Sequence, residues 1–278
     1  LITYGKYQIR PEPPFIPGAE ISGVVVSAPE GSGFAPGDRV LAAAYLGGYA
    51  ERIAVNPAQV LRIPDGLAFD EAASLIINYQ TMEFALARRA KIVAGETVVV
   101  LGAAGGVGTA AIQIAKALGA RVFTTAGSDD KCAACIGLGA EQAINYRSAD
   151  FVEVLRAEGG ANLILDMVGG SYLPRNVKAL ADDGRLVQIA FLTGPKVELN
   201  FAEVMMRRLT ITGSTLRPQS DLAKAGYAAE LEQHVWPMIA AGKLRVVLDS
   251  EYALEDAAEA HRRMESSGHI GKIVLRVG

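Results

Sequence analysis

Short runs of apolar and β-branched residues fill residues 19–64 of the chain. The runs ISGVVVSA, DRVLAAA, YAERIAV and QVLRIP are separated by Gly, Pro, Asp and Asn, which favour turns. A helical pattern follows at 70–90, where apolar positions recur at spacings of three and four and basic residues close the segment. We therefore expect an all-β unit that ends near this helix.

From residue 97 onward, strand-like apolar runs alternate with helical segments. Strands are expected at 97–104, 121–126, 143–146, 162–170, 184–190 and 209–216, and helices at 106–118, 131–137, 150–157 and 173–180. Such alternation requires a parallel sheet with helices on both faces. Further helices are expected at 221–241 and 254–266, and strands at 246–248 and 272–277. We expect these last strands to return to the β-rich unit.

Composition narrows the function classes. The net charge is −3 without a basic block, so we expect no nucleic-acid partner. The longest apolar stretches fall well short of the roughly 20 residues that cross a bilayer, so we expect no membrane span. The chain starts at Leu1 rather than Met and shows no signal-peptide pattern. We expect a cytoplasmic protein whose leading segment is missing here.

The strongest local signal is the run VVVLGAAGGVG, which is followed by the helical segment TAAIQIAKALGA. A dinucleotide fold needs small residues at such a turn, for the tight bend, the close approach of the pyrophosphate and the packing of helix on strand. Ala103, Gly105 and Gly108 occupy these places, although Ala103 replaces the commoner leading glycine. Similar turns also join strands to helices without any ligand, but the regular alternation that follows favours a cofactor.

At this point the sequence resembles the zinc-free NADPH:quinone oxidoreductases of the medium-chain dehydrogenase/reductase superfamily, the zeta-crystallin-like branch. The likeness rests on GKYQIRPEPPFIPGAEISGVV, GDRV, GGYAE, the glycine turn, TAGSDDK, INYR, LILDMVGGSY, DGRLVQIA, LTITGSTL and HIGKIVLRV. It implies an α/β fold in which a doubly wound Rossmann domain is inserted into a discontinuous, β-rich GroES-like domain, with nicotinamide held in a cleft between them. Relatives carry several strands before GKYQ, so the first part of the GroES-like domain is expected to be missing.

The resemblance also implies domains and a site. The expected domains are a GroES-like part at 1–76, a Rossmann domain at 77–240 and a return to the first domain at 241–278. The cofactor-binding residues carried over are Thr81, Ala104, Gly105, Gly106, Val107, Gly127, Ser128, Lys131, Tyr146, Ile189, Ala190, Phe191, Ser214, Thr215 and Leu216. Thr81 is matched to the threonine beside the nicotinamide ribose, and Asn78 is a weaker candidate near the nicotinamide.

Structural roles compete with some of these assignments. Tyr146 is also compatible with a strand end, Lys131 with an exposed helix position, and Thr81 with a cap at a helix break. Asp182 and Asp183 precede Gly184 and are interpreted as turn residues rather than as an acid pair.

The residues present limit the chemistry. Zinc enzymes of the superfamily need Cys and His ligands, but the two cysteines, Cys132 and Cys135, lie three apart on an expected helix and the three histidines are scattered. No G-x-S-x-G motif is present for serine hydrolysis. The expected reaction is therefore hydride transfer from NADPH to a quinone. The alternatives are reduction of α,β-unsaturated carbonyls or of enoyl and acryloyl thioesters, and a non-catalytic NADPH-binding protein that serves as a crystallin or binds RNA.

Two further expectations concern cofactor and assembly. NAD-dependent enzymes place an acidic residue at the end of the second Rossmann strand. Here that place is Ala126, and Gly127, Ser128 and Lys131 leave room and charge for a 2′-phosphate, so NADPH is expected. The neighbouring acids Asp129 and Asp130 are expected to face solvent.

The alternating strand LTITGSTL is expected to form the sheet edge and to join two copies as a homodimer.

Overall fold

The computed structural model describes residues 2–5 and 10–278, so positions 6–9 of the first family motif lie outside the described residues. Contacts divide the chain into two units. Unit 1 holds Leu1–Ile77, Ser220–Ala240 and Val246–Gly278, and unit 2 holds Asn78–Gln219 and Ala241–Arg245. The sequence predicts 220–240 in the Rossmann domain and 241–245 in the returning part of the first domain. The predicted domain boundaries differ from this division at both places and stay a prediction.

Unit 2 is built on a six-stranded, all-parallel sheet with the strand order β6-β5-β4-β7-β8-β9. The strands are β4 (Thr97–Val100), β5 (Arg121–Ala126), β6 (Gln142–Asn145), β7 (Ala161–Asp166), β8 (Leu180–Gln188) and β9 (Thr210–Gly213). Numbered from β4, this is the order 3-2-1-4-5-6 of a dinucleotide-binding sheet. The expected parallel Rossmann sheet is confirmed, and the strand order reverses between β4 and β7.

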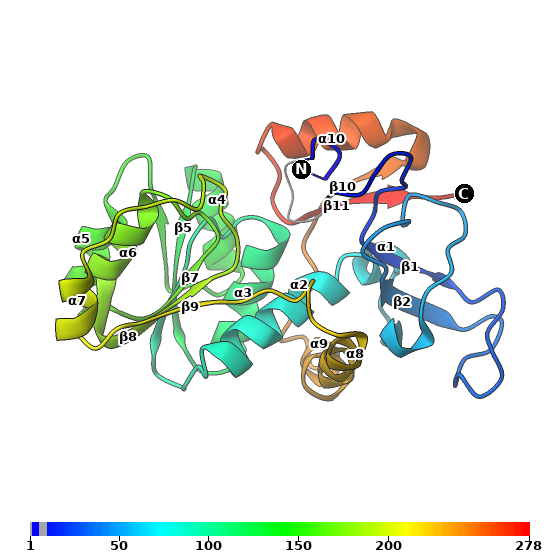
Figure 1. The fold of residues 1–278 in the computed structure, drawn as a ribbon, viewed down its shortest axis with the longest axis horizontal. Helices are drawn as coiled ribbons and strands as arrows, with labels where there is room; N and C mark the ends of the chain where they lie inside the picture. The colour runs from blue at the N-terminus through cyan, green and yellow to red at the C-terminus, as the bar shows by residue number, and fades with distance from the viewer. Residues whose placement is uncertain (1, 6–9) are drawn as a thin grey trace. The chain divides into compact units, whose positions relative to one another are not determined.

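Helices cover both faces of this sheet, with α3 on one side and α5 and α6 on the other (Figure 1). The helices of unit 2 are α3 (Gly106–Ala117), α4 (Asp129–Gly137), α5 (Phe151–Ala157), α6 (Tyr172–Ala179) and α7 (Phe201–Met206), preceded by the π-helical η2 (Glu83–Arg89). A strand covered on both faces has no solvent side, so it needs apolar residues throughout. Val98, Val99 and Val100 are fully buried for this reason.

Unit 1 contains an antiparallel sheet of β1 (Glu20–Val24), β2 (Arg39–Ala43) and β3 (Val60–Arg62), and a parallel pair of β10 (Leu248–Ala253) and β11 (Lys272–Arg276). Its helical elements are η1 (Pro57–Gln59), α1 (Phe69–Ala72), α8 (Asp221–Glu230), the π-helical η3 (Leu231–Val235), α9 (Trp236–Ala240), η4 (Leu254–Asp256) and α10 (Ala257–Glu265). The ammonium of Lys272 lies 2.5 Å from a carboxylate oxygen of Glu20 and so links β11 to β1. By their contacts, β10 and β11 belong to the same unit as β1, β2 and β3.

Several expected elements differ from those observed. Residues 49–55 form no strand. The backbone of this segment bonds outside the sheet instead, since the amide of Tyr49 donates to the carbonyl oxygen of Pro17 over 3.0 Å. The helix expected at 70–90 is broken into α1, α2 (Ile76–Met82) and the π-helical η2, and the strand expected at 246–248 begins only at Leu248. Helix α6 ends at Ala179, because Leu180 already belongs to β8.

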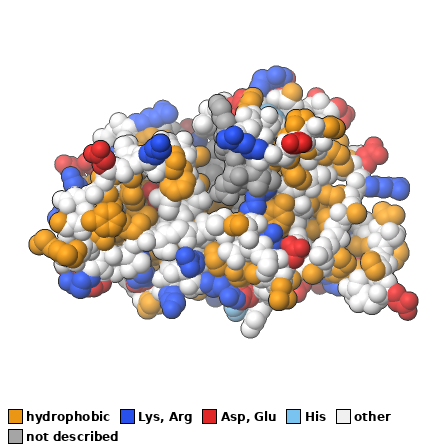
Figure 2. Space-filling model, viewed as in Figure 1, with side chains coloured by type: hydrophobic (Ala, Val, Ile, Leu, Met, Phe, Trp, Pro, Cys, Tyr) orange, Lys and Arg blue, Asp and Glu red, His pale blue; other side chains and the backbone are white. Residues whose placement is uncertain are grey.

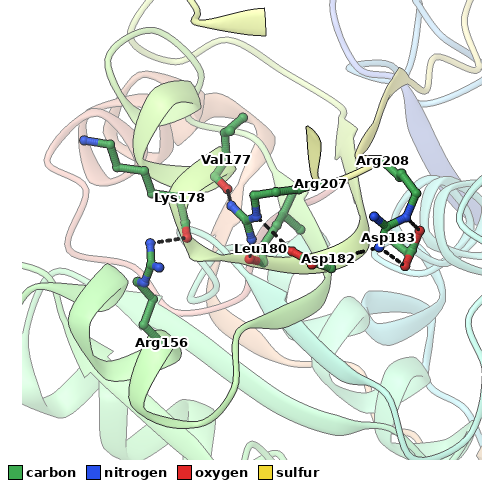
Figure 3. Close-up of polar contacts among 8 residues, drawn as sticks. All are labelled: Arg156, Val177, Lys178, Leu180, Asp182, Asp183, Arg207 and Arg208. Atoms are coloured by element: carbon green, nitrogen blue, oxygen red, sulfur yellow. Dashed lines mark hydrogen bonds and ion pairs between the residues drawn. The ribbon is translucent and has the colours of Figure 1, made fainter. Parts of the chain in front are cut away.

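Arginine side chains bind the carboxyl end of α6 (Figure 3). The guanidinium of Arg207 donates to the carbonyl oxygen of Val177 over 2.9 Å and to that of Leu180, while Arg156 donates to the carbonyl oxygen of Lys178 over 3.4 Å. The last carbonyls of a helix have no partner within the helix and carry the negative end of its dipole. The arginines supply both the missing donors and a positive charge.

The turn expected at Asp182 and Asp183 is a distorted part of β8 instead. Asp183 has a left-handed backbone with φ of 60°, and Arg208, in the turn between α7 and β9, also has a left-handed φ, of 54°. The two side chains form a bidentate ion pair with distances of 2.7 and 2.8 Å, and Asp182 pairs with Arg207 (Figure 3). These contacts tie the chain between α7 and β9 to the start of β8.

Within the described residues, none of the helices combines the length and the apolar character that a membrane span requires.

Candidate cofactor site

The residues predicted to bind the cofactor gather at one edge of the unit 2 sheet. In a parallel sheet all strands end at the same edge, and ligands bind there, at the point where the strand order reverses. The segments that follow the ends of the six strands begin at residues 101, 127, 146, 167, 189 and 214. All predicted cofactor contacts except Thr81 lie in or next to these segments.

The glycine turn follows β4 and runs into α3, whose N-cap is Gly105. A Cβ built on Gly108 would lie 2.4 Å from the carbonyl oxygen of Ala103, so the helix packs against the turn too closely for any side chain. The amide of Ala103 donates to the carbonyl oxygen of Thr125 over 3.0 Å, and the amide of Gly102 to the Thr125 hydroxyl over 3.1 Å. These bonds fix the turn against β5.

The outer side of this turn is not covered by described residues. A Cβ built on Gly105 would meet none of their atoms within 4 Å, unlike one on Gly108. The amides of the first turn of a helix have no partner within the helix, and they attract anions together with the positive end of the helix dipole. Gly105, Gly106 and Val107 therefore offer backbone donors to a pyrophosphate, while the buried Ala104 keeps the turn compact.

A second turn joins β5 to α4. Ala126, which ends β5, is buried and uncharged. The hydroxyl of Ser128 caps α4 by accepting a hydrogen bond from the amide of Lys131 over 3.4 Å. Asp129 and Asp130 are exposed in the first turn of α4, as expected from the helix dipole.

Tyr146, directly after β6, faces this second turn. Its amide donates to the carbonyl oxygen of Ala126 over 3.1 Å, and its side chain is 41% exposed. A Cβ built on Gly127 would lie 2.5 Å from its hydroxyl oxygen. Gly127 and Tyr146 thus come from neighbouring strands and lie in direct contact, beside the turn that carries Ser128.

The segments after β7 and β8 are joined by hydrogen bonds. The amide of Ile189 donates to the carbonyl oxygen of Asp166 over 2.8 Å, and the amide of Thr193 donates to that of Val168 over 2.9 Å. The Thr193 hydroxyl also contacts the carbonyl oxygens of Val168 and Gly169, at 3.0 Å each. Residues 189–191 are therefore held by the β7 loop, and the ring of Phe191 is 53% exposed beside it.

Asp166 organises the β7 loop, and the sequence analysis did not single it out. Its carboxylate is fully buried and accepts hydrogen bonds from the amides of Val168 (2.6 Å) and Gly169 (3.0 Å) and from the side-chain amide of Asn176 (2.9 Å). Burial raises the pKa of the Asp166 carboxyl, and these hydrogen bonds oppose the rise in part. The only sequence signal was an acid at a strand end, directly before a turn with two glycines.

Residues 214–216 follow the edge strand β9. The amide of Ser214 donates to the carbonyl oxygen of Gln188 over 2.9 Å, which places this segment beside the end of β8. The Ser214 hydroxyl is buried without a hydrogen-bond partner among the described residues, and such a group costs free energy until it finds one. Leu216 is buried and Thr215 is exposed.

Asn78 and Thr81 lie on α2 rather than after a strand, Asn78 buried and Thr81 half-buried. The hydroxyl of Tyr79 donates to the carbonyl oxygen of Arg245 over 3.1 Å, and Gln113 of α3 donates to the same oxygen over 3.0 Å. Helices α2 and α3 therefore share a partner. The roles of Asn78 and Thr81 beside the nicotinamide stay predictions.

In the described part of the chain, no group of three or more His, Cys, Asp or Glu side chains could hold a metal ion. Burial raises the pKa of the Cys135 thiol to about 11, and the pKa of Cys132 is also raised, mainly by burial. Both thiols are therefore neutral at physiological pH, whereas zinc binds the thiolate.

Known families match along the chain. The alcohol dehydrogenase GroES-like domain matches residues 1–65, and the zinc-binding dehydrogenase model matches residues 138–275. The quinone oxidoreductase of Homo sapiens is 32% identical, over 99% of this chain and 83% of the relative. The chain belongs to the quinone oxidoreductase family. This confirms the predicted membership of the medium-chain superfamily. It also confirms the predicted fold, which combines a Rossmann sheet with a GroES-like domain.

Solved structures of this family and superfamily superimpose closely. The quinone oxidoreductase of Thermus thermophilus, which was also solved in complex with NADPH, is 36% identical with a TM-score of 0.87, over 99% of this chain and 86% of that one. A structure described as an NAD-dependent alcohol dehydrogenase is 32% identical with a TM-score of 0.88 and the same coverage. The two names differ in cofactor, so they do not decide whether this chain binds a 2′-phosphate.

Proposed function

We propose that this quinone oxidoreductase family member transfers hydride from NADPH to a quinone. The observation that carries the proposal is the edge of the unit 2 sheet, where the segments after five of the six parallel strands (β4, β5, β6, β8 and β9) present the predicted cofactor contacts. The names of the human and Thermus thermophilus relatives support the same reaction.

The described residues fit a dinucleotide. The open face at Gly105 admits a pyrophosphate to the first turn of α3, whereas a side chain at that position would narrow the approach. The Ser214 hydroxyl, which has no partner among the described residues, gains one if it rotates toward a bound ligand. Under this proposal Gly105, Gly106 and Val107 hold the pyrophosphate, residues 189–191 and 214–216 hold the nicotinamide end, and Thr81 contacts the ribose.

The preference for NADPH follows from the end of β5. NAD-dependent enzymes place a carboxylate here that binds the ribose hydroxyls. Ala126 has no carboxylate. The Tyr146 hydroxyl lies over Gly127, and Ser128 and Lys131 follow Gly127 at the start of α4. This part of the chain thus carries two hydroxyls and one positive charge, the chemistry that a 2′-phosphate requires. Lys131 is half-buried, so its charge is less screened than that of an exposed lysine.

Bound NADPH supplies the hydride, from C4 of its nicotinamide. The protein's residues bind and orient the cofactor, and the exposed ring of Phe191 offers an apolar surface that excludes water beside the nicotinamide end. Reduction of a quinone ends on oxygens that water can protonate. The reaction therefore needs neither a protein acid nor a metal, and we propose that the protein works without zinc.

The proposal also includes an oligomeric state and a cellular location. Strand β9 is the last strand of the sheet, and three side chains of the neighbouring α7 are largely exposed: Phe201 (69%), Met205 (74%) and Met206 (72%). Hydrophobic side chains gather over this part of the surface in Figure 2. A terminal strand beside an exposed apolar helix favours pairing with a second copy, so we propose a homodimer. The two cysteines are free thiols, which fits the cytoplasmic location that we propose.

The experiment is a substrate panel. NADPH oxidation is followed by absorbance with ortho-quinones, para-quinones, enals and acryloyl thioesters, using full-length protein. Quinones should be the best substrates. Faster turnover of enals or thioesters would assign the enzyme to alkene reduction instead, and no turnover of any substrate would favour a non-catalytic protein. One equivalent of zinc by elemental analysis, with activity lost on its removal, would overturn the metal-free mechanism.

A further inference from the structure

Asn145 connects the two turns that would surround the 2′-phosphate. It is the last residue of β6 and lies beside Ala126, the last residue of β5, in the register of the sheet. Its side chain has one donor group and one acceptor, and both are used. The donor reaches the turn after β5, and the acceptor reaches the turn after β6.

The donor holds Asp129. The side-chain amide of Asn145 donates to a carboxylate oxygen of Asp129 over 2.7 Å, a short distance for a hydrogen bond to an ionised group. Asp129 follows Gly127 and Ser128 directly, so its carboxylate is the nearest negative charge in the sequence to the proposed phosphate position. The hydrogen bond fixes one oxygen of that carboxylate toward β6 and offsets part of its charge.

The acceptor holds the turn that carries Tyr146. The amide of Arg147 donates to the side-chain oxygen of Asn145 over 3.1 Å, which forms an Asx turn. This turn fixes the backbone on both sides of Tyr146, whose amide is bonded to Ala126 and whose hydroxyl lies over Gly127.

We propose that Asn145 is a positioning residue that sets the preference for a 2′-phosphate. It restrains the carboxylate of Asp129, which would otherwise repel the phosphate, and it orients Tyr146 toward Gly127. This inference rests on the proposed function, because it needs NADPH as the cofactor. It adds a determinant of cofactor choice that does not itself contact the phosphate.

The test measures binding rather than turnover, by calorimetry with adenosine 2′,5′-bisphosphate and with 5′-AMP. Asn145→Asp keeps the acceptor for Arg147 but loses the donor and adds a charge beside Asp129. It should weaken binding of the bisphosphate by about tenfold or more, the effect of roughly one charge-assisted contact. Binding of 5′-AMP should change by less than about twofold, because AMP has no 2′-phosphate.

Two further variants control for folding and charge. Asp129→Asn removes the carboxylate without changing residue 145, and it should leave binding of the bisphosphate unchanged or make it tighter. The exchanged pair, Asn145→Asp with Asp129→Asn, restores a donor and an acceptor to the two positions. It should recover most of the affinity that Asn145→Asp loses, a rescue that general damage to the fold would not produce.

The outcomes separate the two proposals. Equal binding of both ligands by the unmodified protein would overturn the proposed NADPH preference, and this inference with it. A preference for the bisphosphate that all Asn145 variants leave unchanged would overturn this inference alone. Equal weakening of both ligands by Asn145→Asp would also overturn it, since that result shows a general structural role.

Discussion

The hydroxyl oxygen of Tyr146 lies only 2.5 Å from the position that a Cβ on Gly127 would occupy, and the ring carbon that bears the hydroxyl lies 3.0 Å from it. Real Cβ atoms do not approach other atoms so closely. Because an aromatic ring cannot bend away, a side chain at 127 must displace either Tyr146 or the turn after β5. Gly127 is therefore needed for its lack of volume, since its φ is not in the left-handed region.

Gly127→Ala should accordingly lower the free energy of unfolding by about 1–3 kcal/mol, the usual effect of overpacking. It should also raise the Michaelis constant for NADPH, because the displaced turn carries Ser128. Gly137→Ala is the matched control, since a Cβ at Gly137 in α4 would meet no atom of the described residues within 4 Å. Urea unfolding and steady-state kinetics check both variants. Equal free energies of unfolding and equal Michaelis constants for NADPH in the two alanine variants would contradict the close contact between Gly127 and Tyr146.

Lys131→Ala should raise the Michaelis constant for NADPH by roughly tenfold or more, since it removes one charge-assisted contact to the 2′-phosphate. Kinetics with NADH should hardly change. Lys178→Ala removes the same charge from the last turn of α6 and should affect neither cofactor. Ala126→Asp should shift the preference toward NADH. A loss of equal size with both cofactors in Lys131→Ala would show that Lys131 is structural.

Asp166 is expected to matter through its hydrogen bonds and not through its charge. Asp166→Ala leaves the amides of Val168 and Gly169 without their acceptor and should lower the free energy of unfolding by about 3 kcal/mol. Asp166→Asn keeps that acceptor. Its amide can also donate to the side-chain oxygen of Asn176, which is buried without a partner in the described structure, if that side chain turns over. This variant should therefore unfold within about 1 kcal/mol of the unmodified protein at neutral pH.

The same residue predicts a dependence on pH. Burial raises the pKa of the Asp166 carboxyl above its ordinary value of 3.8. At a pH between these two pKa values, the folded protein keeps a proton on Asp166 that the unfolded chain has released. The contribution of Asp166 to stability should then fall as the pH rises from about 4 through the raised pKa. Urea unfolding of the unmodified protein and of Asp166→Asn across this range isolates the effect, because asparagine does not titrate. A difference between the two proteins that stays constant with pH would contradict it.

The exposed face of α7 gives a prediction about assembly. Phe201→Asp with Met205→Asp should convert a dimer of the full-length protein into a monomer at micromolar concentration, as measured by light scattering. Leu222→Asp is the control, because Leu222 is 85% exposed but belongs to α8 of unit 1 rather than to the sheet of unit 2. A monomer before any substitution would contradict the proposed homodimer.

Much of unit 2 could be predicted because strands covered on both faces must be apolar throughout. Runs such as VVV in β4 stand out from their surroundings, and the glycine turn after β4 leads directly into α3. Unit 1 was harder. Residues 49–55 alternate like a strand, yet their backbone binds elsewhere, since the amide of Tyr49 donates to the carbonyl oxygen of Pro17.

The candidate site divides in the same way. Small residues at the turn around Gly105 could be predicted because the turn restricts the residue type locally. Gly127 came from the family resemblance, and the cofactor roles of both glycines stay predictions. The roles of Asp166 and Asn145 depend on partners such as Asn176 and Asp129, which only the folded chain brings near. Neither residue belongs to a spacing pattern, so sequence reasoning had no signal strong enough to select them.

The most direct test of the account compares kcat/KM for NADPH and NADH in the unmodified full-length protein, with one quinone as the acceptor. The neutral end of β5 and the hydroxyls and charge around Gly127 predict turnover with both cofactors and a preference for NADPH of at least about tenfold, the effect of one charge-assisted contact. Equal use of the two cofactors, or no oxidation of NADPH with any quinone, would contradict the account.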